Sequence, residues 1–144
     1  MKKVLAVLLC ISLLFAVSSC SKSGSATQYE EGIDYDLAAM SNTLAYSIVY
    51  NMVCSPQDYL GTTVRMQGVY ACSYDEANDK HYFACIITDA NACCSQGIEF
   101  ELTDEYTYPD DYPEEGSVIC VTGVFDVYQD GDNSYCTLRN ATLG

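Results

Sequence analysis

The spacing of apolar residues changes once along this 144-residue chain, near Gly61, and the change limits the folds that the chain can adopt. Before Gly61, apolar residues recur at intervals of three and four, as they do on one face of an α-helix. After it they alternate with polar residues, as in residues 97–102, a pattern typical of a strand with one buried and one wet face. One helix followed by a mainly β domain is therefore expected.

The helical pattern predicts a helix over residues 36–53. Asp36 is placed as its N-cap, and the helix is expected to end at Ser55 because the residue before a proline, here Pro56, is disfavoured in the α region. The apolar stripe is expected to pack on the core, and it consists of Leu37, Met40, Leu44, Ile48 and Met52.

Five strands are expected after the helix, over residues 62–74, 80–89, 97–102, 117–128 and 134–143. Gly68 indicates a bulge or bend in the first strand, and residues 103–116, which contain two prolines, are expected to form a loop. This order favours a small five-stranded OB-like barrel preceded by one N-terminal α-helix, over residues 36–144. An open β-sandwich or another small barrel is the alternative.

Residues 1–19 have the features of a secretory signal peptide. Lys2 and Lys3 precede an apolar stretch over residues 4–17, which is too short to cross a bilayer as a helix. Small residues then precede Cys20, an order that resembles the lipobox of bacterial lipoprotein precursors. The resemblance implies cleavage before Cys20, lipidation of Cys20, and a lipid-anchored protein on the extracytoplasmic face of a bacterial membrane.

Residues 20–35 are rich in serine and glycine and are expected to form a flexible tether. The formal net charge of the chain is −14, and loss of residues 1–19 would remove two lysines and no acid, making it −16. Such a surface repels phosphate backbones and anionic headgroups. Nucleic acid is therefore not expected as a partner, and the lipid anchor alone is expected to hold the domain at the membrane.

Pro56, Tyr59 and Gly61 lead into the first expected strand, and the pair Cys93–Cys94 closely follows the second. With these features, residues 36–142 resemble a group of uncharacterised lipoproteins from Gram-positive anaerobes. More distantly, they resemble the C-terminal domain of a bacterial family of proposed permease components. Both resemblances imply the fold expected above, and neither implies an activity.

Seven of the nine cysteines follow Cys20, namely Cys54, Cys72, Cys85, Cys93, Cys94, Cys120 and Cys136. An odd number leaves at least one free thiol in any set of intramolecular disulfides. If residues 88–91 form the turn between the second and third strands, Cys85 faces Cys94, and a disulfide between them is one interpretation. The other interpretation is that most of the cysteines are small buried apolar residues.

Cys85, Cys93 and Cys94 are the candidate ligands for zinc or another soft metal ion. The chain lacks paired C-x2-4-C motifs, and adjacent cysteines on a strand point to opposite faces unless a turn intervenes. His81 is not expected to join them, because four residues of strand separate it from Cys85 by ~13 Å. No cofactor is therefore expected, with zinc as the alternative.

A cysteine-nucleophile enzyme would have to use His81, the single histidine, with Cys72 as its partner across the 75–79 turn. The sequence indicates no strained nucleophile turn and no oxyanion hole, and the acidic surroundings oppose thiolate formation. Catalysis is therefore not expected.

Two acidic turns flank the face on which OB-folds bind their ligands. The first turn carries Asp75, Glu76 and Asp79, and the second carries Asp130 and Asp132. Such residues are ordinary in turns, and a cation site is the alternative interpretation.

Tyrosines near the same strand ends form a candidate ligand face for a peptide or a sugar, and they are Tyr70, Tyr74, Tyr82, Tyr128 and Tyr135. The sequence thus favours a cell-envelope lipoprotein that acts as a non-catalytic binding module. The alternative is a metal-binding or thiol-redox protein that uses Cys93 and Cys94.

Replacing Cys20 tests the anchor. In cells fed a labelled fatty acid, the wild-type chain is expected to carry the label and Cys20→Ala is not, because the acyl chains would be attached at Cys20. Cys10→Ala is the matched control and is expected to be labelled like wild type. Equal labelling of Cys20→Ala and wild type would contradict the assignment.

Overall fold

A computed structural model of the chain describes residues 32–144. The expected signal peptide, Cys20 and most of the expected tether lie outside the described residues. Over the range 32–144, no helix is both long enough and apolar enough to cross a membrane.

Five long strands make up most of the described chain, and all five confirm the expected strands to within two residues. They are β2 (Thr63–Asp75), β3 (Lys80–Thr88), β4 (Ser95–Leu102), β5 (Val118–Asp130) and β6 (Asn133–Leu143). A further short strand, β1 (Tyr35–Asp36), pairs in parallel with the start of β2. Residues 103–116 contain no helix or strand, as expected from their prolines.

The five long strands form a closed ring. The sheet order is β1-β2-β3-β4-β6-β5, and β2 also pairs with β5. Within the ring β4 and β6 run parallel, and the other neighbouring pairs are antiparallel. The mainly β architecture with one N-terminal helix is therefore as expected, built on a mixed sheet with a ring of five strands.

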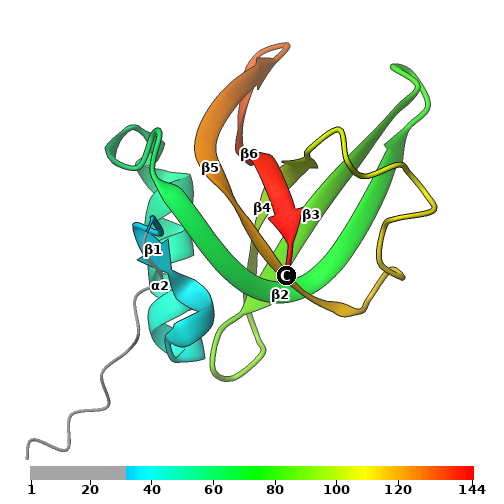
Figure 1. The fold of residues 1–144 in the computed structure, drawn as a ribbon. Coiled ribbons are helices and arrows are strands. Elements are labelled where there is room, and N and C mark those ends of the chain that lie inside the picture. The colour runs from blue at the N-terminus through cyan, green and yellow to red at the C-terminus, as the bar shows by residue number, and fades with distance from the viewer. Residues whose placement is uncertain (1–31) are drawn as a thin grey trace, which may run out of the picture.

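Strand β2 closes the ring because its two halves pair with different strands. Residues 63–69 pair with β5, and residues 69–75 pair with β3. Gly68 lies at the changeover, where an added Cβ would stand 2.4 Å from the carbonyl oxygen of Ile86 and 2.8 Å from the sulfur of Cys85. The strand curves through this region without a register shift (Figure 1). The bend expected at Gly68 thus corresponds to a point where two backbones approach too closely for any side chain.

The interior of the ring is filled by inward-facing apolar side chains. Residues Met66, Ile98, Phe100, Val121, Phe125 and Leu138 are among the largest that are fully buried. They alternate with outward-facing residues along each strand, so the period-two pattern of the sequence matches the buried face.

The predicted start of the helix expected over residues 36–53 is wrong. A short 3-10 helix, η2 (Leu37–Ala39), comes first, and the carboxylate of Asp36 accepts a hydrogen bond from the Ala39 N–H at 3.3 Å. Met40 is then extended, and α2 (Asn42–Cys54) begins only after Ser41, whose hydroxyl accepts from the Leu44 N–H at 3.4 Å. A serine is as good an N-cap as an aspartate, so Ser41 starts the longer helix.

The expected apolar stripe is confirmed at Leu37 and Met52, which are buried, and at Met40 and Ile48, which are half-buried against the core, but it is wrong at Leu44. Ala45, Val49 and Met52 are buried, whereas Leu44 is 50% exposed. The helix packs against β3 and β4, and the side chain that faces these strands in its first turns is Ala45 instead of Leu44. It ends at Ser55 as expected, and η3 (Pro56–Asp58) follows.

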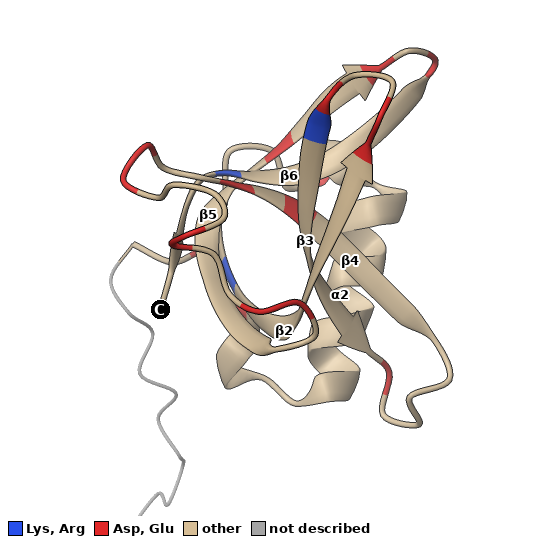
Figure 2. Cartoon of the chain, turned by 90° about the vertical axis from the view of Figure 1, so that its right-hand side faces the viewer, with Lys and Arg blue, Asp and Glu red and all other residues tan. Residues whose placement is uncertain are grey.

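The connections between strands place the acidic residues at the ends of the ring. The β2–β3 and β5–β6 hairpins project from the same end, while residues 103–116 run beside the β2–β3 hairpin on the side away from α2 (Figure 1). Most acidic residues lie in these turns and in the 103–116 loop (Figure 2). The loop alone carries six acidic residues, so that side of the molecule is strongly negative.

Candidate functional site

The first part of β3 lacks a partner on one side, and a cleft forms there. Pairing of β3 with β4 begins at Ala84, so residues 80–83 pair with β2 only. Two adjoining hollows of about 240 Å³ and 350 Å³ flank this segment, and both are lined by His81 and Tyr112. We call the two hollows together the aromatic cleft. Their combined volume is in the range of small-molecule sites.

Aromatic rings from three segments line the cleft. Strand alternation puts His81 and Phe83 on the inward face of β3, and the 103–116 loop adds Tyr108 and Tyr112. The ring centroids of Phe83 and Tyr112 are 4.4 Å apart, and those of His81 and Tyr108 are 4.5 Å apart. Tyr74 of β2 extends the row, with its ring centroid 4.7 Å from that of His81. These contacts hold the rings in place before any ligand arrives.

Two hydroxyl groups in the lining of the cleft are buried without a hydrogen-bond partner. Tyr70 is a lining residue of the larger hollow and Thr137 of the smaller one, the two residues are 2% and 1% exposed, and their hydroxyl oxygens are buried behind the wall of the cleft. Burial raises the pKa of Tyr70, and the nearby Cys72 thiol raises it further. An unpaired buried hydroxyl costs about 1–3 kcal/mol, so these two hydroxyls are expected to lower the stability of the folded domain.

The five tyrosines expected to form a ligand face are divided between the core and the rim of the cleft. Tyr70 is buried and Tyr74 is exposed at the larger hollow. Tyr82 and Tyr128 border the smaller hollow, and Tyr135 stacks on Tyr128 with ring centroids 5.5 Å apart. Part of the expected face therefore lines the aromatic cleft.

Hydrogen bonds fix the rim of the smaller hollow. The Tyr128 hydroxyl donates to Glu99 at 2.5 Å, and the Tyr82 hydroxyl donates to Asp130 at 3.2 Å, which ties β3 to the β5–β6 hairpin. The ammonium of Lys80 lies 4.5 Å from the centroid of the Tyr82 ring. Burial, and then the Glu99 carboxylate, raise the pKa of Tyr128, so this tyrosine stays a neutral donor.

Sequence reasoning missed several residues of the cleft. Phe83, Tyr112 and Thr137 face the hollows but were not singled out. The three tyrosines in residues 103–116, at positions 106, 108 and 112, are the sequence signal that points to this loop as part of a site. Thr137 carried no signal, since its burial depends on how β6 packs.

The two acidic turns do not assemble a cation site in the described part of the chain. The carboxylate of Asp75 accepts from the Ala77 N–H at 2.8 Å and from the Asn78 amide at 2.7 Å, which lowers its pKa. Asp79 adopts a left-handed conformation and accepts from the Tyr74 hydroxyl. Glu76 and Asp132 do not join a group of three ligand atoms in residues 32–144. The observed contacts of Asp75 and Asp79 are those of ordinary turn residues.

The expected register between Cys85 and Cys94 is wrong. Thr88 pairs with Ser95 and Cys85 pairs with Ile98, because the turn between β3 and β4 spans residues 89–94 instead of 88–91. Cys85 is fully buried, and burial raises its pKa to about 12. The structure thus gives no support to a Cys85–Cys94 disulfide or to Cys85 as a ligand beside Cys93 and Cys94.

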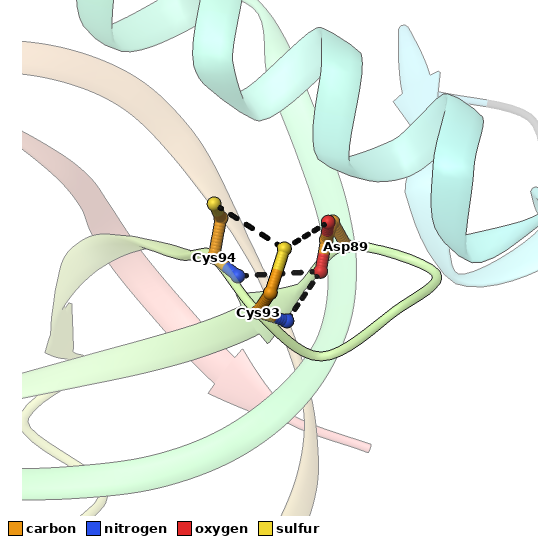
Figure 3. A group of neighbouring side chains, drawn as sticks. All are labelled: Asp89, Cys93 and Cys94. Carbon is orange, nitrogen blue, oxygen red and sulfur yellow. Dashed lines mark hydrogen bonds between the residues drawn. The ribbon is translucent and has the colours of Figure 1, made fainter.

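Asp89 takes the place that was expected for Cys85. Its side chain lies with those of Cys93 and Cys94 in the β3–β4 turn, and the ligand atoms of the three residues all fall within 4.8 Å of one another (Figure 3). The sulfur of Cys93 is 3.1 Å from an Asp89 oxygen and 3.7 Å from the Cys94 sulfur. The turn brings the adjacent thiols to the same side, which a continuing strand would not do.

Cys72 and His81, the pair considered for catalysis, are in contact at the edge of the larger hollow. The Cys72 sulfur lies 3.7 Å from Nδ1 of His81 and 3.9 Å from the Tyr108 hydroxyl. The contact belongs to the aromatic lining of the cleft, where the thiol acts as a polarisable neighbour of the rings.

Comparison with known proteins yields likeness to solved structures only. No protein-family profile and no curated protein sequence matches the chain. A crystal structure described as that of a "putative nucleic acid-binding lipoprotein" from Klebsiella pneumoniae matches 76% of this chain and 89% of its own, with 21% identity and a TM-score of 0.45. A likeness of this extent carries nothing about ligand, partner or location to this protein.

Replacing Tyr70 tests whether its hydroxyl lacks a partner. Tyr70→Phe is expected to leave the free energy of unfolding unchanged or to raise it by up to about 1 kcal/mol, because no hydrogen bond is lost. The matched variant Tyr128→Phe loses the bond to Glu99 and is expected to be about 1 kcal/mol less stable. Urea unfolding at neutral pH measures both changes. A loss of more than about 1 kcal/mol in Tyr70→Phe would show that the hydroxyl is satisfied.

Proposed function

We propose that this protein is a non-catalytic binding module and that a neutral saccharide occupies its aromatic cleft. The single observation that carries the proposal is the row of aromatic rings that lines two adjoining hollows, namely Tyr74, His81, Phe83, Tyr108 and Tyr112. Stacked and tilted ring contacts hold these side chains in place, so the cleft presents a prearranged aromatic surface to a ligand.

The chemistry of the lining suits a sugar. The exposed rings of Tyr74 and Tyr108 offer flat apolar faces to the C–H faces of a pyranose, while hydroxyls both donate and accept. Glu101 and Glu115 at the two hollows can accept hydrogen bonds from sugar hydroxyls. A neutral ligand avoids the repulsion that the acidic turns and loop would exert on an anion.

The ring of strands supports the same interpretation at the level of fold. We take the ring, with its parallel β4–β6 pair and its two hairpins projecting from one end, as an OB-like barrel. OB-folds bind oligosaccharides or oligonucleotides on the face that these hairpins flank. This analogy supports a binding role, and the choice of a saccharide over nucleic acid rests on the net charge of −14.

The proposed function also depends on where the protein lies in the cell. With Cys20 lipidated, the domain would be tethered at the extracytoplasmic face of a bacterial membrane, within reach of envelope glycans. The tether ends close to β1, and β1 lies beside the first residues of β2 rather than at the projecting hairpins. The tether would therefore not block the opening of the cleft.

Thiol-redox chemistry at Cys93 and Cys94 is the less favoured alternative. The neighbouring Asp89 carboxylate, and then Cys94, raise the pKa of Cys93 to about 11. Redox-active cysteines instead have lowered pKa values, because the thiolate is the reactive form.

Binding of a neutral oligosaccharide tests the proposal. Titration calorimetry of the full chain in detergent micelles with chitohexaose or cellohexaose is expected to show saturable binding. Tyr74→Ala/Tyr108→Ala is expected to weaken this binding about tenfold, the effect of losing roughly 1.4 kcal/mol of ring contact.

Two controls decide the outcome. Tyr50→Ala removes a tyrosine that is 49% exposed on α2, away from the cleft, and is expected to bind like wild type. A twelve-nucleotide oligothymidylate is expected not to bind at physiological salt. Absence of binding with both hexasaccharides would overturn the saccharide proposal, and tight binding of the oligonucleotide would overturn the exclusion of nucleic acid.

A further inference from the structure

The β3–β4 turn carries a second constellation of polar side chains, at the opposite end of β3 from the aromatic cleft. Within residues 32–144, Asp89, Cys93 and Cys94 are the one group of three metal-ligating side chains whose ligand atoms converge. None of these three residues lines the aromatic cleft. They also differ from the rest of the acidic surface, because two of the three ligands are thiols.

We propose that Asp89, Cys93 and Cys94 bind a single zinc ion, or a similar divalent thiophilic cation, in tetrahedral geometry with the fourth position open. The proposal does not depend on the saccharide-binding role of the cleft. Two thiolates and one carboxylate form a ligand set that suits zinc, which accepts sulfur and oxygen ligands.

The distance between the two sulfurs fits a tetrahedral ion. Two thiolates bound at ~2.3 Å with a tetrahedral angle between them lie ~3.7–3.8 Å apart. The sulfurs of Cys93 and Cys94 are 3.7 Å apart. A linear two-coordinate ion would require a separation of two full metal–sulfur bonds, so the observed spacing favours tetrahedral coordination.

The backbone of the turn orients the Asp89 carboxylate. One oxygen, Oδ1, accepts from the N–H groups of Cys93 at 2.9 Å and Cys94 at 3.3 Å. The other, Oδ2, is left facing the Cys93 sulfur at 3.1 Å (Figure 3). Outer hydrogen bonds of this kind hold a ligand in the direction that a metal needs. The left-handed conformation of Ala92 gives the turn the shape that places both thiols beside the carboxylate.

Charge favours a cation at the same point. The Asp89 carboxylate lies 3.1 Å from the Cys93 sulfur, so a cation bound by the thiols would also meet a negative charge. A divalent cation would neutralise the group and allow both thiols to bind as thiolates, with release of their protons.

The exposure of the turn indicates what such a site could do. Cys93 and Cys94 are exposed, whereas structural zinc sites are closed by four protein ligands. Three protein ligands leave one position for water or for a donor atom of another molecule. The geometry thus suits a surface site that accepts or passes on a metal ion.

Cobalt binding tests the proposal with a spectroscopic signal. The full chain is purified in detergent with a phosphine reductant, without oxygen and without metal, and titrated with Co²⁺. One equivalent is expected to give a sulfur-to-cobalt charge-transfer band and the visible bands of a tetrahedral site, and Zn²⁺ is expected to displace it. Cys93→Ser and Cys94→Ser are each expected to weaken zinc binding by at least about tenfold, since even residues behind a ligand have effects of that size.

Matched variants separate ligand loss from unfolding. Asp89→Asn keeps an oxygen that can accept from the turn but removes the charge, and it is expected to weaken binding while the thermal melt of the metal-free protein is unchanged. Cys54→Ser replaces an exposed cysteine at the end of α2 and is expected to bind metal like wild type. Absence of the charge-transfer band, or a band that survives in the Cys93→Ser/Cys94→Ser double variant, would overturn the proposal.

Discussion

Closure of the ring through β2 is the constraint on which the rest of the structure depends. One strand must pair with β5 along its first half and with β3 along its second half, and the changeover falls next to Gly68. The backbone of Ile86 approaches Gly68 so closely that a Cβ would stand 2.4 Å from its carbonyl oxygen. The fold therefore requires a glycine here for reasons of space, since the φ angle of Gly68 is not in the left-handed region.

The same closure creates the candidate cleft. Because β2 turns away from β5 at its midpoint, its second half and the start of β3 extend beyond the ring as a hairpin. Residues 80–83 then have no β4 neighbour, and the inward face of that segment would be open to solvent. The 103–116 loop covers it with Tyr108 and Tyr112, and the hydroxyls of Tyr70 and Thr137 are left without partners.

Local sequence patterns predicted the parts of the fold that local physics decides. All five long strands follow from period-two alternation and turn residues, and the bend follows from Gly68. The start of α2 was missed because Asp36 and Ser41 are both good N-caps, and each of them caps a helix. The buried face of α2 was misjudged at one position, Leu44, since Ala45 is too small to stand out in an apolar stripe that tertiary packing selects.

The candidate sites were less predictable, because they depend on register and on long-range packing. The expected β3–β4 turn covers residues 88–91, whereas the observed turn covers residues 89–94. In the observed register Cys85 pairs with Ile98 instead of Cys94, and Asp89 lies beside the two thiols. A strand register that shifts by a few residues changes every cross-strand pair, so sequence spacing alone could not choose the third ligand. The burial of Thr137 could not be predicted from the sequence either, because it depends on how β6 packs.

The central claim is that a neutral saccharide lies against the aromatic rings of the cleft. Backbone amide shifts of the isotope-labelled protein, followed by NMR during titration with chitohexaose, test it most directly. The account predicts that shifts concentrate in residues 70–74, 80–83 and 108–112 and around Thr137, with α2 and the 89–94 turn unchanged. Shifts that concentrate on α2 or the 89–94 turn, or a titration with no shifts at all, would contradict it.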